Sequence, residues 1–302
     1  MIYAAMKKVK SFFSYIGKTL AHHWVIVLVT IIATAGAAVG GVLIGSSVFR
    51  QTYDPNAVNV VEDDIEALYK RYQECGGDYS SFEPYELANI GLHKATLHDS
   101  LRIVSKGDVV AAGVSQTVRG YSIKNNDSYF MENISKGLIS CSWRIYQTSS
   151  VKTYPGHDID VETAKYDEGS ATEYSLDDYA STWGKLLSRP NIYIISEDTV
   201  LEKSVSQEGC EYHVDLNLDP NKAVVNYVKQ MKMVSGLSDY PVFYKVNLKF
   251  TLDSELNLKK INTTEQYEVN KLGVHLSDGT LEDIYYYDEA TPIPELNTPV
   301  VY

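Results

Sequence analysis

The chain has little of what enzymes use for chemistry. Among 302 residues it has three cysteines and seven histidines, with no Cys-x-x-Cys pair and no His-Glu-x-x-His run. It also has no Gly-x-Ser-x-Gly elbow, no Gly-rich phosphate loop and no Lys-Thr-Gly triplet. These absences argue against zinc, serine-nucleophile and nucleotide sites. We therefore expect no catalytic residue, no metal and no cofactor, and a protein that is not an enzyme.

Two short motifs resemble reactive sites. Ser149 and Lys152 match Ser-x-x-Lys, but the partner triplet is missing and the stretch alternates like a strand. His157 with Asp158 and Asp160 offers three metal-ligand types in a polar loop without a second cluster. We interpret the first as chance and the second as a solvated turn.

Three cysteines leave one over if any pair forms. Cys141 and Cys210 both fall in predicted strand regions, so they are the preferred pair if a disulfide exists. The alternative is three buried free thiols, Cys75 included, and the sequence leaves both open.

Charged residues are absent from Thr19 to Phe49. A run of that length can cross about 30 Å of hydrocarbon. We predict a basic cytosolic segment over 1–19, a transmembrane anchor over 20–49, a tether over 50–60, an extracytoplasmic domain over 61–288 and a Pro-containing tail over 289–302. The small residues near Ala35 and Ala37 leave a cleaved signal peptide as the rival of a signal anchor.

Lysines precede the apolar run, and acidic residues do not. Lys7, Lys8, Lys10 and Lys18 lie before it, which predicts a cytosolic N-terminus. The protein is then a single-pass cell-membrane protein whose C-terminal domain is extracellular, as expected for a component of a bacterial envelope.

Small residues recur at spacing four within this run, where they would let two helices approach closely. We expect helix–helix self-association through Gly36, Gly40, Gly41 and Gly45. The alternative is that these glycines only make the run rich in small residues.

The formal net charge is −12. Nucleic-acid phosphates would be repelled by an acidic protein, so we expect no nucleic-acid partner. Phenylalanines number seven against 24 tyrosines. Tyrosine combines an apolar ring with a polar end, which suits core rims and binding surfaces alike.

Helical spacing of apolar residues predicts one helix over 61–75 and a second from Ser81 to about Val104, with Leu101 in its buried stripe. A short helix follows over 176–188. Asp219 and Pro220 predict the cap and first turn of a long helix over 220–235.

Alternation with a period of two predicts strands elsewhere. They cover 113–123, 127–135, 142–154, 191–196 and 211–220. The clearest strand is 242–252, in which Val246, Leu248 and Phe250 face the core. In the next strand the phase slips near Lys259–Lys260, which predicts a bulge. We expect a loop over 155–175 and a turn over 277–280.

The order of these elements predicts an α+β fold: an N-terminal transmembrane helix, two helices, then a curved antiparallel β-sheet, an open half-barrel, with one long inserted helix.

Residues 110–288 resemble the LolA-like superfamily of lipoprotein carriers and envelope sensors. The resemblance lies in "CEYHVDLNLDP", "NKAVVNYVKQMKMVSGL", "YPVFYKVNLKFTLDSELNLKKI" and "TTEQYEV". It is architectural and has no catalytic signature. It implies a half-barrel closed by helices over an apolar cavity. The chain differs from the carriers in its predicted helical anchor.

If the inserted helix covers the sheet, its stripe meets the inward sides of the strands. These side chains either form a solid core or line a ligand cavity; they are Tyr212, Val214, Leu216, Tyr227, Met231, Val246, Leu248 and Phe250.

The function expected from the sequence is that of a membrane-anchored, non-enzymatic protein that binds an apolar ligand, such as a lipid, or an envelope protein, for sensing or assembly. Two alternatives stay open: a cell-wall enzyme with an unrecognised site, and a structural ectodomain with a filled core.

Overall fold

The computed structural model describes residues 52–302 except 112, 138–139, 190, 271–272 and 288–290. Residues from Thr52 to Tyr302 form one compact unit. The predicted cytosolic segment, the anchor over 20–49 and the glycine pairs Gly36/Gly40 and Gly41/Gly45 lie outside the described residues. None of the helices in the described part has the length and apolarity that a bilayer crossing needs.

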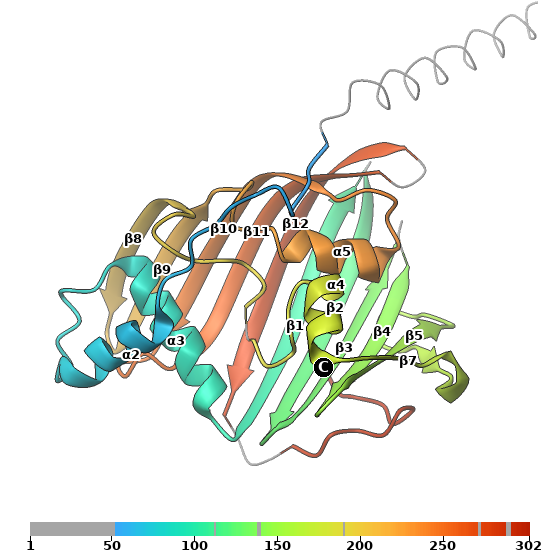
Figure 1. Ribbon diagram of the computed structural model, residues 1–302, viewed down its shortest axis with the longest axis horizontal. Helices are drawn as coiled ribbons and strands as arrows, with labels where there is room; N and C mark the ends of the chain where they lie inside the picture. The colour runs from blue at the N-terminus through green and yellow to red at the C-terminus, as the bar shows by residue number, and fades with distance from the viewer. Residues whose placement is uncertain (1–51, 112, 138–139, 190, 271–272, 288–290) are drawn as a thin grey trace, which may run out of the picture. The chain divides into compact units, whose positions relative to one another are not determined.

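A 12-stranded antiparallel sheet dominates this unit (Figure 1). In the sheet the strands follow the order β6-β5-β4-β3-β2-β1-β12-β11-β10-β9-β8, and β7 pairs with β5. The strands are β1 (Ser100–Ala111), β2 (Val114–Asn125), β3 (Ser128–Lys136), β4 (Cys141–Gln147), β5 (Val151–His157), β6 (Lys165–Tyr166), β7 (Thr172–Tyr174), β8 (Val200–Glu208), β9 (Glu211–Leu218), β10 (Val242–Leu252), β11 (Leu258–Asn270) and β12 (Val274–Tyr286).

Four α-helices lie against one face of the sheet, which we call the covered face (Figure 1). They are α2 (Ile65–Glu74), α3 (Pro84–Leu97), α4 (Leu176–Trp183) and α5 (Tyr227–Ser235). Helix α3 packs on β8–β11, and α5 contacts α4 and β4. The α+β class and the open antiparallel sheet are therefore confirmed for the described residues.

Helix α3 is shorter than the sequence predicted. It ends at Leu97, and Leu101 and Val104 belong to β1 instead of a helical stripe. The Lys124 ammonium donates to the carbonyls of Thr96, at 2.7 Å, and His98. A cation at the last carbonyls satisfies groups that a helix end leaves free, so this contact favours termination there.

Helix α5 begins later than predicted. Asp219 accepts a hydrogen bond from the Asn221 amide at 2.8 Å, so it does cap a turn, but regular helix starts only at Tyr227. The loop after α4 passes close to the break: a Cβ on Gly184 would lie 2.1 Å from the Asn226 carbonyl oxygen.

Two strand predictions are wrong. Residues 191–196 form no strand; the Ile194 amide donates to the Ala223 carbonyl at 2.9 Å, and the segment crosses the covered face. Residues 277–280 form no turn but lie inside β12, between two neighbouring strands that take up its backbone hydrogen bonds. Strand β8 was not predicted, because most of its residues are exposed and polar.

The strand over 242–252 has the predicted bounds. The bulge near Lys259–Lys260 is also confirmed, because Thr251 pairs with Lys260 whereas Leu252 pairs with Leu258. A second irregularity at Tyr244 was not predicted. It reverses the phase locally, so Phe243 is buried and Tyr244 is exposed.

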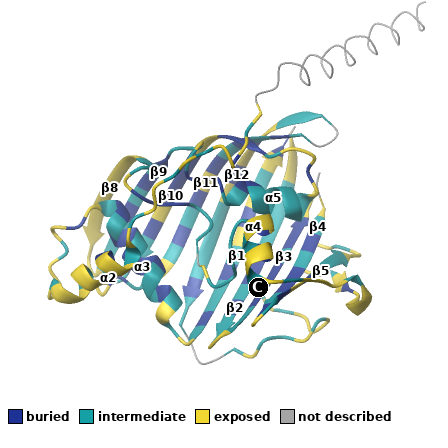
Figure 2. Cartoon of the chain, viewed as in Figure 1, coloured by how far each residue is buried: buried dark blue, intermediate teal, exposed yellow. Residues whose placement is uncertain are grey.

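Burial on the covered face is uneven (Figure 2). The largest core lies where α3 meets β9–β11, and it includes Leu216, Leu248 and Phe250. A second cluster joins α4 to β3–β5 through Tyr179 and Trp183. The core is therefore dense at both sides of the covered face.

The other face is covered in part by the tail. Ile293, Val300 and Tyr302 pack against Phe130 and its neighbours. Beneath them Arg144 and Glu132 form a buried ion pair, and Tyr302 donates to Glu132 at 2.7 Å. The described part of the tail is irregular, and its side chains pack against the sheet.

Candidate functional site

A cavity of about 270 Å³ lies on the covered face between the two dense cores. Its floor is formed by β1, β2, β3, β10, β11 and β12, with Cys141 at the start of β4. Its cover is formed by α5, Lys185 and residues 191–193. Figure 1 shows α4 and α5 in front of the central strands. The irregular segment over 191–196 thus covers the sheet instead of extending it.

The cavity exists because the central strands carry small side chains on this face. Ser105 pairs with Gly120, Ser122 with Ile103, and Gly279 with Val109. These serines and glycines line the cavity. On β9 and β10 the inward residues include larger leucine and phenylalanine side chains, which belong to the large buried core.

Glu265 projects into the cavity from β11 although it is only 7% exposed. The Tyr227 hydroxyl donates to its Oε2 atom over 3.5 Å. Burial, and secondly the charge of Asp283, raise the pKa of Glu265 to about 8. The side chain is therefore mostly neutral at pH 7.

Asp283 and Lys185 form a second polar group at the cavity. Burial raises the pKa of Asp283 to about 6, against the opposing effects of a Ser105 hydrogen bond and the Lys185 charge. Burial lowers the pKa of Lys185 to about 8, and Asp283 opposes that change. Asp283 is half-exposed because it faces the cavity, yet protein surrounds it. At pH 7 the two groups are mostly ionised and oppositely charged.

Aromatic rings gather at the Glu265 end, where Tyr193, Tyr227 and Tyr267 line the cavity and Phe243 packs behind them. The ring centroids of Tyr193 and Tyr227 are 5.2 Å apart, those of Tyr227 and Phe243 5.6 Å, and those of Phe243 and Tyr267 5.0 Å. Burial raises the pKa values of Tyr227 and Tyr267, so both hydroxyls stay protonated and can donate. Rings and hydroxyls together give a wall that accepts both apolar and polar atoms.

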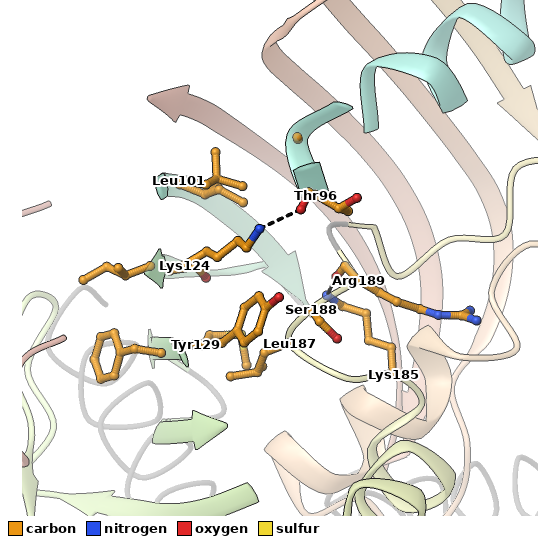
Figure 3. A pocket seen from close by; sticks show the side chains of 14 residues that line it. Thr96, Leu101, Lys124, Tyr129, Lys185, Leu187, Ser188 and Arg189 are labelled. Carbon is orange, nitrogen blue, oxygen red and sulfur yellow. Dashed lines mark hydrogen bonds between the residues drawn. The ribbon is translucent and has the colours of Figure 1, made fainter. Parts of the chain in front are cut away.

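A smaller pocket of about 80 Å³ adjoins this cavity and shares Lys185 (Figure 3). Lys124 lies along it and donates to the Thr96 carbonyl at 2.7 Å. Arg189 extends away from Tyr129. The Lys124 ammonium is already hydrogen-bonded to carbonyls at the end of α3. The pocket therefore offers little beyond room for a few waters.

Three of the predicted cavity residues line the observed cavity: Tyr227, Met231 and Leu248. The others pack in the large core, where four are buried and one is half-buried; they are Val214, Leu216, Val246, Phe250 and Tyr212. The predicted set is therefore divided between the large core and the wall of the cavity.

Sequence reasoning missed Glu265, Asp283 and Lys185. For Glu265 the sequence holds a signal: Ile261, Tyr267 and Val269 are apolar positions of one strand face, and Glu265 shares their parity. An acidic residue at an inward strand position is unusual unless it is paired. No such pattern marks Lys185, which follows α4 in irregular chain.

The sequence left open a Cys141–Cys210 disulfide or three thiols. In the described residues neither of these two cysteines forms a disulfide, and nor does Cys75. Cys141 starts β4 and Cys210 lies in the turn between β8 and β9, with β3, β2, β1, β12, β11 and β10 between them in the sheet. Bridged cysteines need Cα atoms within about 7 Å, and this separation is far larger.

Within the described residues no three His, Cys, Asp or Glu side chains gather as metal ligands would. His157 lies 3.7 Å from Asp167, and Asp158 pairs with Lys165 at 3.0 Å; all four side chains are largely exposed. This is the solvated turn expected from the sequence.

No protein-family model matches the chain, and no curated protein matches it. Among solved structures, a DUF1329 family protein from Desulfovibrio piger aligns with 69% of this chain and 93% of its own, at 10% identity and a TM-score of 0.26. A likeness of that size assigns neither a family nor a function to the chain.

Proposed function

We propose that the chain is a membrane-anchored, extracytoplasmic binding protein, not an enzyme, that holds a small ligand with an apolar part in the cavity under α5. The observation that supports this most directly is the cavity itself, a gap of about 270 Å³ in an otherwise close-packed covered face. Ligand sites are typically concave and apolar with a few placed polar groups. Leu248, Met231 and Val109 supply apolar wall, and Glu265 and Asp283 supply polar points.

The LolA-like half-barrel is the finer description of the fold within this proposal. An open antiparallel sheet with helices on one face agrees with it. The proposal also includes the anchor over 20–49, an extracellular placement and a lipid or envelope partner. It further includes self-association through Gly36, Gly40, Gly41 and Gly45.

The cavity can be closed by one substitution. A Cβ on Gly279 would have no neighbour nearer than 3.6 Å, so a side chain fits the strand there and would grow into the cavity. We expect Gly279→Leu to fold and to fill the space beside Glu265. Asp278→Leu introduces the same side chain one position away, where the residue is exposed on the other face.

The test is calorimetric titration of the full chain, in lipid nanodiscs, with hexanol. We expect saturable binding to the wild type and to Asp278→Leu, and none to Gly279→Leu. The heat measured with Gly279→Leu nanodiscs then gives the partition of hexanol into lipid, which is subtracted from the other two titrations. Equal heats in all three proteins would contradict the proposal. Native mass spectrometry of the purified chain can then identify a co-purified ligand.

A further inference from the structure

The two acidic side chains at the cavity differ in their partners. Asp283 is influenced by the ammonium of Lys185. Glu265 forms no ion pair within the described part of the chain, and its donor is the Tyr227 hydroxyl over a long 3.5 Å. A buried carboxylate is costly without a positive partner, so Glu265 is held neutral while the cavity is empty.

Among the described residues, Lys185 forms no ion pair with Glu265. Its ammonium donates to the Arg189 carbonyl, and its charge acts on Asp283. The strand register also separates Glu265 from Asp283, on which the Lys185 charge acts. Glu265 pairs with Gly279, and Asp283, four residues further along β12, pairs with Ile261. That is roughly 13 Å along the strand. Among the residues that the structure describes, the Glu265 end thus has a carboxyl group and aromatic rings but no cation.

Aromatic rings complete this end as a cation site. Tyr193, Tyr227 and Tyr267 line the cavity with Glu265. The face of a tyrosine ring attracts a cation, and an ammonium group can also donate to a carboxylate. From there the cavity continues along Leu248 and Met231, which offer an apolar wall to a stem.

We infer that the ligand of this cavity is an amine with an apolar stem, and that its ammonium group pairs with Glu265 among Tyr193, Tyr227 and Tyr267. This inference rests on the proposed function, because it names the class of ligand for the same cavity. The net charge of −12 favours the approach of cations over anions.

Binding has a proton signature. Glu265 must lose its proton to pair with an ammonium, so each bound amine releases close to one proton at pH 7. Besides Glu265, the cavity is lined by the titratable groups Asp283 on β12, Lys185 after α4, Tyr227 on α5 and Tyr267 on β11. The tyrosines stay neutral at this pH, and Asp283 and Lys185 are mostly ionised already. Glu265 is therefore the source of the proton.

The experiment compares hexylamine, hexanol and hexanoate, which share a stem and differ in charge, by calorimetry of the full chain in nanodiscs. We expect hexylamine to bind the wild type at least about tenfold more tightly than hexanol, and hexanoate more weakly than hexanol. Titration in two buffers of different ionisation enthalpy at pH 7 should show about one proton released per hexylamine bound.

Glu265→Gln keeps the shape of the side chain and removes the charge. We expect it to lose the tenfold preference for hexylamine over hexanol and to release no proton on binding hexylamine. Asp283→Asn should keep most of the preference. If hexanol binds and Gly279→Leu abolishes that binding, but hexylamine has no advantage, the amine inference is wrong and the proposed function stands. If no probe binds the wild type, both are wrong.

Discussion

Glu265 shows how one buried acidic residue links stability to pH. Its pKa is about 8 in the folded protein, against an ordinary value of 4.5 for a glutamate side chain. The folded state therefore keeps a proton that the unfolded state has lost between these two values. Because the unfolded state binds fewer protons there, the free energy of unfolding decreases as pH rises from about 4.5 to 8.

We predict that Glu265→Gln removes this dependence. Relative to the wild type, the variant should gain stability between pH 5 and pH 8, by up to about 1.4 kcal/mol per pH unit. Urea denaturation at pH 5, 6.5 and 8 measures the difference. Glu208→Gln, in the exposed strand β8, is the control and should show no such trend. A constant offset between wild type and Glu265→Gln would show that the folded pKa of Glu265 is not raised.

At the scale of elements, β10 combines a packed face and a solvated face. Leu248 is 1% exposed and lies between Leu216 on β9 and Thr263 on β11. Lys249, the next residue, is exposed and pairs with Asp215 at 3.2 Å. The two positions, although adjacent in one strand, therefore differ in which substitutions they accept without loss of stability.

We predict that Leu248→Asp lowers the free energy of unfolding by several kcal/mol, because it buries a charge without a partner. Lys249→Asp should cost about 1 kcal/mol or less, since it loses only an exposed ion pair. Chemical denaturation of both variants, followed by tyrosine fluorescence, provides the comparison. Similar losses in the two proteins would contradict the assignment of the two faces.

At the scale of the whole molecule, the strand order makes the sheet depend on distant parts of the chain. Strand β1 lies between β2 and β12, so the first and last strands of the sheet are neighbours at its middle. The cavity floor joins β1–β3 to β10–β12 across this seam. Its small side chains come from segments more than 130 residues apart.

The predicted anchor can be tested on cells. With a cytosolic N-terminus and an uncleaved span over 20–49, protease added to intact cells should remove the residues after about Arg50 and leave a short membrane fragment. Mass spectrometry of the fragment identifies its ends. A mature N-terminus near Ala37 in untreated cells would show a cleaved signal peptide, and protection of the whole chain would show the reverse orientation.

Local patterns were enough for much of the fold. The alternation over 242–252 predicted β10 with its bounds, and the phase slip predicted the bulge at Lys259, because side-chain direction in a strand repeats every two residues. The apolar run over 191–196 misled the same reasoning. Ile194 and Ile195 are buried as a cover on the sheet, and burial alone does not distinguish a cover from a strand.

The cavity was decided by tertiary structure. From the local sequence, a serine or glycine at an inward position is only a residue that favours strands weakly. The local pattern does not show that Ser105, Gly120 and Gly279 come together on three adjacent strands. The same holds for Cys141 and Cys210, which share strand-like surroundings in the sequence but are separated by six strands of the sheet. The sequence by itself determined which residues alternate and which face inward, because those follow from backbone geometry. Strand order determined which inward residues meet, and the chain must fold before that order exists.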